Sequence, residues 1–209
     1  MNRIPGAAAA LLLAVGAALA AACAGPGSPA PPASTARPSP AVPLPYAGAP
    51  KVDRPLPPSV LSGDPCREAL TAAQLKDILG ATDPPRSEDV PATGPACRWD
   101  HPDSGAGLNV FYDIRTHQGL SAVYRNSKPL MTTWRPIPSV HGFPAVAFAA
   151  YTGIGADDSC DVSMGIADDY TVDAALNLGA SKAGKADACE LTVKVADMVI
   201  ANLSRKAGR

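Results

Sequence analysis

The sequence is poor in aromatic residues and carries almost no net charge. Phe, Trp and Tyr together make up 5% of its 209 residues, and the formal net charge is −1. Nucleic-acid-binding proteins need a basic surface for phosphates, and those that bind single strands also need aromatic side chains on which bases stack. The composition offers neither, so the sequence excludes nucleic acid as a partner.

Motifs for catalysis and metal binding are also absent from the sequence. The three histidines, His101, His117 and His141, are isolated, and no HxH or HExxH spacing provides a metal site. There is no GxSxG nucleophile elbow and no GxxxxGK[ST] or GxGxxG phosphate-binding loop. We therefore expect no cofactor, no metal and no enzyme of a familiar class. An extracytoplasmic enzyme whose site is assembled from distant residues is the alternative.

The chain begins with an apolar segment that ends at a cysteine. Arg3 precedes 17 apolar residues (6–22), which is the pattern of a secretory signal. The residues up to Cys23 resemble a bacterial lipobox, although Leu19 stands one position further from the cysteine than usual. The resemblance predicts a lipoprotein signal peptide over 1–22, cleavage before Cys23 and lipidation (diacylglyceryl and palmitate groups) of Cys23, which anchors a protein to the membrane. The alternative, a transmembrane helix, needs roughly 20 strongly apolar residues, and this segment is short and rich in alanine.

Proline dominates the next part of the chain. Residues 24–58 contain 12 of the 23 prolines, together with Ala, Gly, Ser and Thr. Such a composition lacks the apolar mass for a core, so residues 23–58 are predicted to be the lipidated cysteine followed by a disordered tether. A PxxP ligand for an aromatic groove is the competing interpretation.

Residues 59–205 have the composition of a globular domain. Asp64 before Pro65, and Thr71 paired with Gln74, predict two short helices ending at Gly80. Alternating apolar residues predict strands, and a hairpin is expected to turn at 168–169. Strands are predicted over 96–101, 107–114, 143–151 and the hairpin 160–178, and further helices over 118–128 and 187–203. This arrangement predicts an α+β domain, an antiparallel sheet with helices packed on it.

Four cysteines remain once Cys23 is assigned to lipid. An even number in an exported domain favours two disulfides, for which three pairings are possible. We favour Cys66–Cys97 and Cys160–Cys189, because each joins the start of a helix to a strand. Zinc binding and redox catalysis are disfavoured, because no CxxC spacing occurs.

Four aromatic residues are the candidate binding residues. Trp99, Tyr112, Tyr124 and Trp134 could line an apolar groove for a ligand. In a domain with so few aromatic residues, they could equally fill the core.

The order of features resembles a known family, an actinobacterial lipoprotein family called domain of unknown function 3558. The matching features are the lipobox Cys23, the proline-rich segment, "DPCREALTAAQLKDILG", "CRW", "HGFPAV", "CDVSMGIADD" and "DACELTVKVADMVIANL". The resemblance implies a lipoprotein of the cell envelope, anchored on the outer face of the cell membrane, and it implies no activity. The expected function is therefore noncatalytic binding of a small ligand or of another envelope protein.

Overall fold

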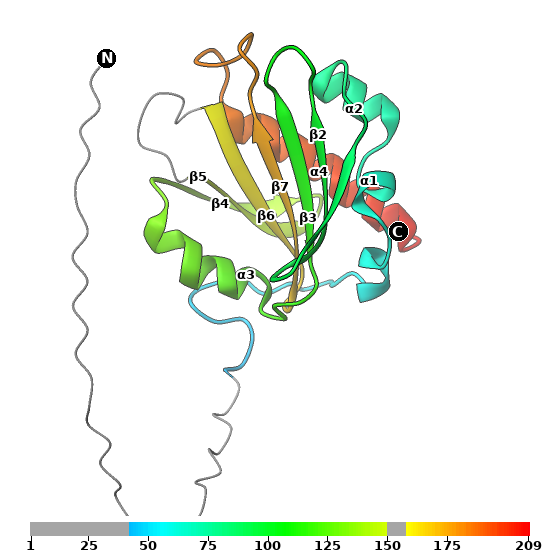
Figure 1. Cartoon of the computed structure of the whole chain (residues 1–209). Coiled ribbons are helices and arrows are strands. Elements are labelled where there is room, and N and C mark those ends of the chain that lie inside the picture. The colour runs from blue at the N-terminus through cyan, green and yellow to red at the C-terminus, as the bar shows by residue number, and fades with distance from the viewer. Residues whose placement is uncertain (1–41, 150–157) are drawn as a thin grey trace, which may run out of the picture. The chain divides into compact units, whose positions relative to one another are not determined.

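A seven-stranded antiparallel sheet forms the centre of the domain (Figure 1). The structure is a computed structural model, and it describes residues 42–149 and 158–209. The strands lie in the order β1-β2-β3-β7-β6-β5-β4, and each neighbouring pair is antiparallel. The α+β fold predicted from the sequence is confirmed. The strands are β1 (Arg86–Val90), β2 (Gly94–Asp100), β3 (Gly107–Asp113), β4 (Thr133–Val140), β5 (Phe143–Ala149), β6 (Ser159–Ala167) and β7 (Tyr170–Asn177).

The helices follow the predicted order along the chain. No helix among the described residues is both long enough and apolar enough to cross a membrane. The last two residues of the strand predicted over 143–151 lie outside the described residues. The helical elements are η1 (Pro58–Leu61), α1 (Pro65–Glu68), α2 (Ala72–Leu79), α3 (Gly119–Ala122) with its continuations η2 (Val123–Ser127) and η3 (Lys128–Leu130), and α4 (Ala188–Lys206).

Different helices cover the two faces of the sheet. On β7, Val172, Ala174 and Leu176 alternate with more exposed residues and pack in the core on which α4 lies. On the other face α3 lies over β6, and a Cβ at Gly165 would be 2.8 Å from the Leu120 side chain. Gly165 therefore lets α3 approach the sheet closely. Figure 1 shows α4, in orange and red, passing behind the strands, with α3 at the lower left.

The predicted helix caps are confirmed. Oδ1 of Asp64 accepts a hydrogen bond from the Cys66 amide at 2.9 Å, and Pro65 takes the first helical position. Thr71 and Gln74 form a reciprocal capping box at the start of α2. These bonds satisfy amides that have no partner within a helical turn, so each helix start is fixed by local sequence.

Two disulfides join helices to strands, with the predicted pairing. Cys66 of α1 is bonded to Cys97 of β2, with a Cα–Cα distance of 4.9 Å. Cys160 of β6 is bonded to Cys189 of α4, with a Cα–Cα distance of 5.0 Å. Each bridge fixes the first turn of a helix to the face of the sheet that it covers.

The predicted boundary between tether and domain at residue 58 is wrong. Val52 and Leu56 are 5% and 2% exposed, so the segment before residue 58 contributes to the core. The Leu56 amide donates to the Ile166 carbonyl at 2.8 Å, and the Val52 amide donates to Asp168 Oδ1 at 2.9 Å. The domain therefore includes the described residues from 42 onward.

Proline content misled the prediction, because an extended proline-rich chain can also lie along a folded surface. Proline lacks an amide donor, but the apolar residues between the prolines keep theirs and bury their side chains.

The C-terminal end of the domain also extends past residue 205. The Arg209 guanidinium donates to the carbonyls of Arg54 and Pro55 at 3.3 and 3.0 Å, which holds the two ends of the domain together. The lipobox, Cys23 and the tether up to residue 41 lie outside the described residues.

Candidate ligand-binding pocket

Two of the four aromatic candidates belong to the core. Trp99 is 1% exposed and Tyr112 is 0% exposed, and both pack in the cluster beneath α4. Burial raises the pKa of the Tyr112 phenol above its ordinary value. The prediction that these two residues line a ligand groove is wrong, because large aromatic side chains supply core volume in a domain that has few of them.

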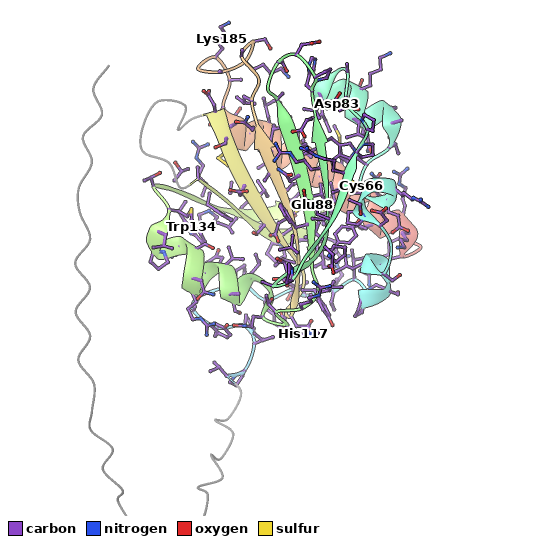
Figure 2. All side chains as sticks on the ribbon, viewed as in Figure 1. Cys66, Asp83, Glu88, His117, Trp134 and Lys185 are labelled. Atoms are coloured by element: carbon purple, nitrogen blue, oxygen red, sulfur yellow. A yellow bond between two sulfur atoms is a disulfide. The ribbon has the colours of Figure 1, made fainter. Side chains whose placement is uncertain are left out.

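The other two aromatic candidates lie together on the opposite face of the sheet. The Tyr124 and Trp134 rings meet edge to face with centroids 5.0 Å apart, and Trp134 stacks on Phe148 at 5.8 Å. The Lys128 ammonium lies 5.6 Å from the Tyr124 centroid and 5.7 Å from that of Trp134. Figure 2 labels Trp134 beside α3. The cluster packs η2 and η3, the continuations of α3, against the sheet. A ligand role for Tyr124 and Trp134 stays a prediction.

A mostly apolar pocket opens at the edge of the α4 layer, and none of the four aromatic candidates lines it. Its volume is about 230 Å³. Its walls come from α2, α4, the β2–β3 turn and the end of β7. The apolar lining consists mainly of Ile78, Leu79, Leu176, Leu178, Leu191 and Met198. A concave apolar surface with a few polar groups at its rim is the usual form of a small-molecule site.

The part of the pocket wall that α4 contributes consists of residues that are less buried than the sequence predicts. The sequence places Leu191, Val195 and Met198 on one apolar face of this helix. Val195 is buried as expected, whereas Leu191 and Met198 are only half-buried at the margin of that face. These two side chains line the pocket together with Val195. The helical periodicity therefore predicts that Leu191 and Met198 lie on the apolar face of α4. It does not predict that both side chains remain partly exposed to solvent.

A polar clamp holds α2 against α4 and so fixes the width of the pocket. Nδ2 of Asn202 on α4 donates to the Ala69 carbonyl at 2.8 Å and to Gln74 Oε1 at 2.9 Å. Gln74 also caps the start of α2 through the Thr71 amide. One side-chain amide thus links the beginning of α2 to the C-terminal part of α4.

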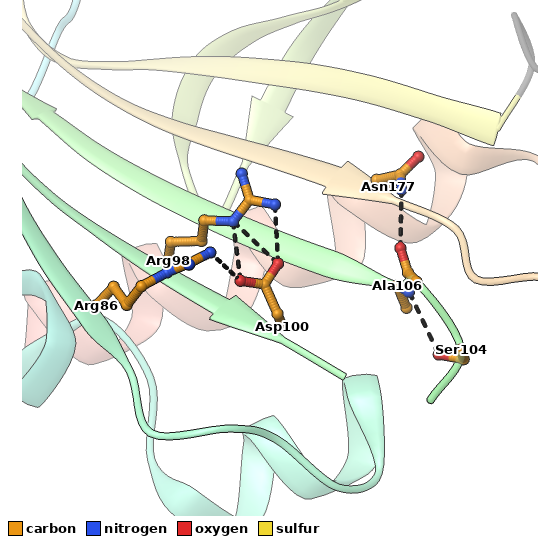
Figure 3. A network of polar contacts seen from close by, with 7 residues as sticks. Arg86, Arg98, Asp100, Ser104, Ala106 and Asn177 are labelled. Carbon is orange, nitrogen blue, oxygen red and sulfur yellow. Dashed lines mark hydrogen bonds and ion pairs between the residues drawn. The ribbon is translucent and has the colours of Figure 1, made fainter. Parts of the chain in front are cut away.

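The β2–β3 turn forms a rigid opposing wall. Nδ1 of His101 accepts hydrogen bonds from the amides of Asp103 and Ser104 at 3.0 and 3.1 Å. Figure 3 shows the far end of this turn, where Nδ2 of Asn177 on β7 donates to the Gly105 carbonyl at 3.0 Å. The turn is therefore bonded within itself and to β7, and these bonds restrict its movement.

A second polar network in Figure 3 lies on β1 and β2, at one edge of the sheet. The guanidinium groups of Arg86 and Arg98 both contact the Asp100 carboxylate. The hydrogen bond from Arg98 is the main cause that lowers the pKa of Asp100. The network ties β1 to β2, and these three residues do not line the pocket.

An acidic pair lies on the sheet face opposite α4. The pKa of Asp173 on β7 is raised to about 7, mainly by burial and also by the charges of Asp113 and Asp161. Hydrogen bonds from the hydroxyls of Ser163 and Thr171 act in the opposite direction. Burial also raises the pKa of Asp161 on β6 to about 6. Oδ1 of Asp173 is buried, and no described residue forms a hydrogen bond with it.

Comparison with known families gives one match. A family model described as "Protein of unknown function (DUF3558)" matches residues 18–202. The chain belongs to this family. The matched region contains Cys23, the four disulfide cysteines and all the residues named above as apolar lining of the pocket. No curated protein and no solved structure matches the chain.

Proposed function

We propose that the protein is a lipid-anchored protein of the cell envelope that binds a small apolar ligand without catalysing a reaction. The observation that carries the proposal is the apolar pocket between α2, α4 and the β2–β3 turn. The lipobox-like sequence at Cys23 supports the anchor, and two disulfides suit an oxidising compartment outside the cytoplasm. The proposed place is the outer face of the cell membrane.

The pocket has two properties that favour binding. Ile78, Leu191 and Met198 leave apolar surface half-exposed, and covering such surface contributes about 25 cal/mol per Å². The clamp at Asn202 and the bonded β2–β3 turn hold the walls in place. A ligand therefore loses little free energy to ordering of the protein, which strengthens binding.

We predict that filling the pocket abolishes binding of an apolar probe. The probe is the neutral compound N-phenyl-1-naphthylamine, and the readout is the ¹³C-methyl NMR signal of Met198, which lines the pocket. In the full chain carrying Cys23→Ser, the probe should shift this signal saturably. Leu191→Trp, which places an indole in the pocket, should weaken the apparent affinity at least about tenfold, equivalent to about 1.4 kcal/mol.

Val193→Trp is the matched control for the pocket experiment. Val193 is also half-buried on α4 but does not line the pocket. This variant should bind the probe as the unaltered chain does. Equal binding by the Leu191 variant, or no shift of the Met198 signal in the unaltered chain, would refute a binding role for the pocket.

We predict that Cys23→Ser removes the membrane anchor. The serine hydroxyl cannot form the thioether to diacylglycerol, so the variant should appear in the soluble fraction or remain unprocessed. Mass spectrometry of the mature N-terminus should show an acylated cysteine in the unaltered protein. Cys66→Ala together with Cys97→Ala is the control for loss of cysteines in general and should leave membrane retention intact. Unchanged retention and mass after Cys23→Ser would contradict the anchor.

A further inference from the structure

The mouth of the pocket carries more positive than negative charge. Two exposed lysines line the pocket, Lys182 in the segment before α4 and Lys194 on α4. Asp77 at the end of α2 is the one acidic residue among the described residues that line it. The excess charge at the rim is therefore positive, whereas the walls below it are apolar.

Both lysine side chains are free to meet a ligand. Lys182 and Lys194 are exposed, and neither ammonium forms an ion pair or a hydrogen bond with the part of the chain that the structure describes. Lysine lays its methylene stem along apolar surface while its ammonium stays in water. Two lysines of this kind at an apolar pocket suit a ligand that has an apolar chain and a negatively charged head group.

We infer that the pocket takes an amphipathic molecule with one anionic head group and a short apolar chain, as in a medium-chain fatty acid. This inference rests on the proposed binding function. The chain lies against Leu191 and Met198, and the head group lies between Lys182 and Lys194. A volume of about 230 Å³ falls below the ~300–1,000 Å³ of most small-molecule pockets, which favours a short chain over a large ring system or a two-chain lipid.

The experiment compares three probes that share a ten-carbon chain and differ in the head group. Decanoate, 1-decanol and decyltrimethylammonium are titrated, below their micelle concentrations, into the full chain carrying Cys23→Ser. The ¹³C-methyl signal of Met198 reports binding in the pocket, and that of Met131, which does not line the pocket, is the reference. Decanoate should bind at least about fivefold more tightly than decyltrimethylammonium, because exposed charge pairs contribute modestly.

Neutralising the two lysines tests their role directly. The double variant Lys182→Gln and Lys194→Gln should weaken decanoate binding roughly fivefold to tenfold and leave decanol binding unchanged. Lys51→Gln removes an exposed lysine that does not line the pocket, and it should leave decanoate binding unchanged. Raising the salt concentration should reduce the preference for decanoate, because exposed charges are screened.

The outcomes separate the inference from the function on which it rests. Equal affinity for the three probes, or an unchanged affinity of the lysine double variant for decanoate, overturns the inference and leaves the apolar pocket as the binding site. No saturable shift of Met198 with any of the three probes or with N-phenyl-1-naphthylamine overturns both.

Discussion

Replacing Cys160 and Cys189 together by alanine should lower the free energy of unfolding by about 3–4 kcal/mol. The bridge closes a loop with a sequence separation of 29, and loops of that length restrict the unfolded chain by about this amount in the chain-entropy account. Both cysteines are nearly fully buried, at 2% and 6% exposure, so the folded state keeps its packing apart from the two lost sulfur atoms. Urea unfolding, followed by circular dichroism, measures the change.

The reduced wild-type chain provides the control for this variant. Reductant breaks both bridges while retaining all the cysteine side chains, so the reduced wild-type chain should lose more stability than the alanine variant. When reductant is added to the alanine variant, its free energy of unfolding should fall only by the contribution of the Cys66–Cys97 bridge, the one bridge that the variant retains. A loss below about 1 kcal/mol in the oxidised variant would show that the bridge between β6 and α4 does not stabilise the fold.

Asp173→Asn should stabilise the protein at pH 8 and flatten the dependence of its stability on pH. The carboxyl group has a pKa of about 7 in the folded state, above its ordinary value of 3.8, so the folded state binds more protons than the unfolded state between these values. The contribution of the Asp173 carboxyl to the free energy of unfolding is therefore largest below about pH 4, and it is lost as the pH rises through about 7. The neutral amide removes this penalty, and we expect a gain on the order of 2–4 kcal/mol at pH 8.

Urea unfolding of both proteins between pH 5 and pH 8 tests this expectation. The acidic groups that face Asp173 are Asp161 on β6 and Asp113 on β3, and the hydroxyls of Ser163 and Thr171 lie beside it. Asp161→Asn should give a smaller gain, because the pKa of Asp161 is raised only to about 6. Asp53→Asn, at an exposed position, is the control and should change nothing. Parallel pH curves for the wild type and Asp173→Asn would disprove the account.

The two edge strands were not predicted from the sequence. β1 reads RSEDV and is almost wholly exposed, so it has no apolar alternation to recognise. β4 contains Pro136 and Pro138, which argue against a central strand. Both elements lie at the ends of the strand order, where one side of the backbone has no ladder to maintain. Prolines and charged residues are tolerated in an edge strand because one side of its backbone is unpaired. The sequence does not show which strands lie at the edges, because tertiary structure decides that.

The pocket could not be predicted either, because its walls come from parts of the chain that are far apart. Ile78, Leu178 and Leu191 meet only once α2 and the end of β7 have packed beside α4. The sequence pattern gave equal weight to Leu191 and Val195, and only the rotation of α4 against the sheet leaves the first accessible. Aromatic side chains were the natural candidates for a groove, but Trp99 and Tyr112 fill the core.

What the sequence determined by itself is local. Helix starts at Asp64, Thr71 and Asp187 depend on bonds between residues two or three positions apart, and strand alternation depends on the two-residue repeat. The cysteine pairing was also predictable, since Cys66 and Cys189 each lie in the first turn of a helix and their partners Cys97 and Cys160 each lie in a strand. Tertiary structure alone decided the rest. Whether the proline-rich segment before residue 58 packs or stays free, and which apolar side chains remain half-exposed in a pocket, depends on surfaces contributed by distant segments. No periodicity within one segment carries that information.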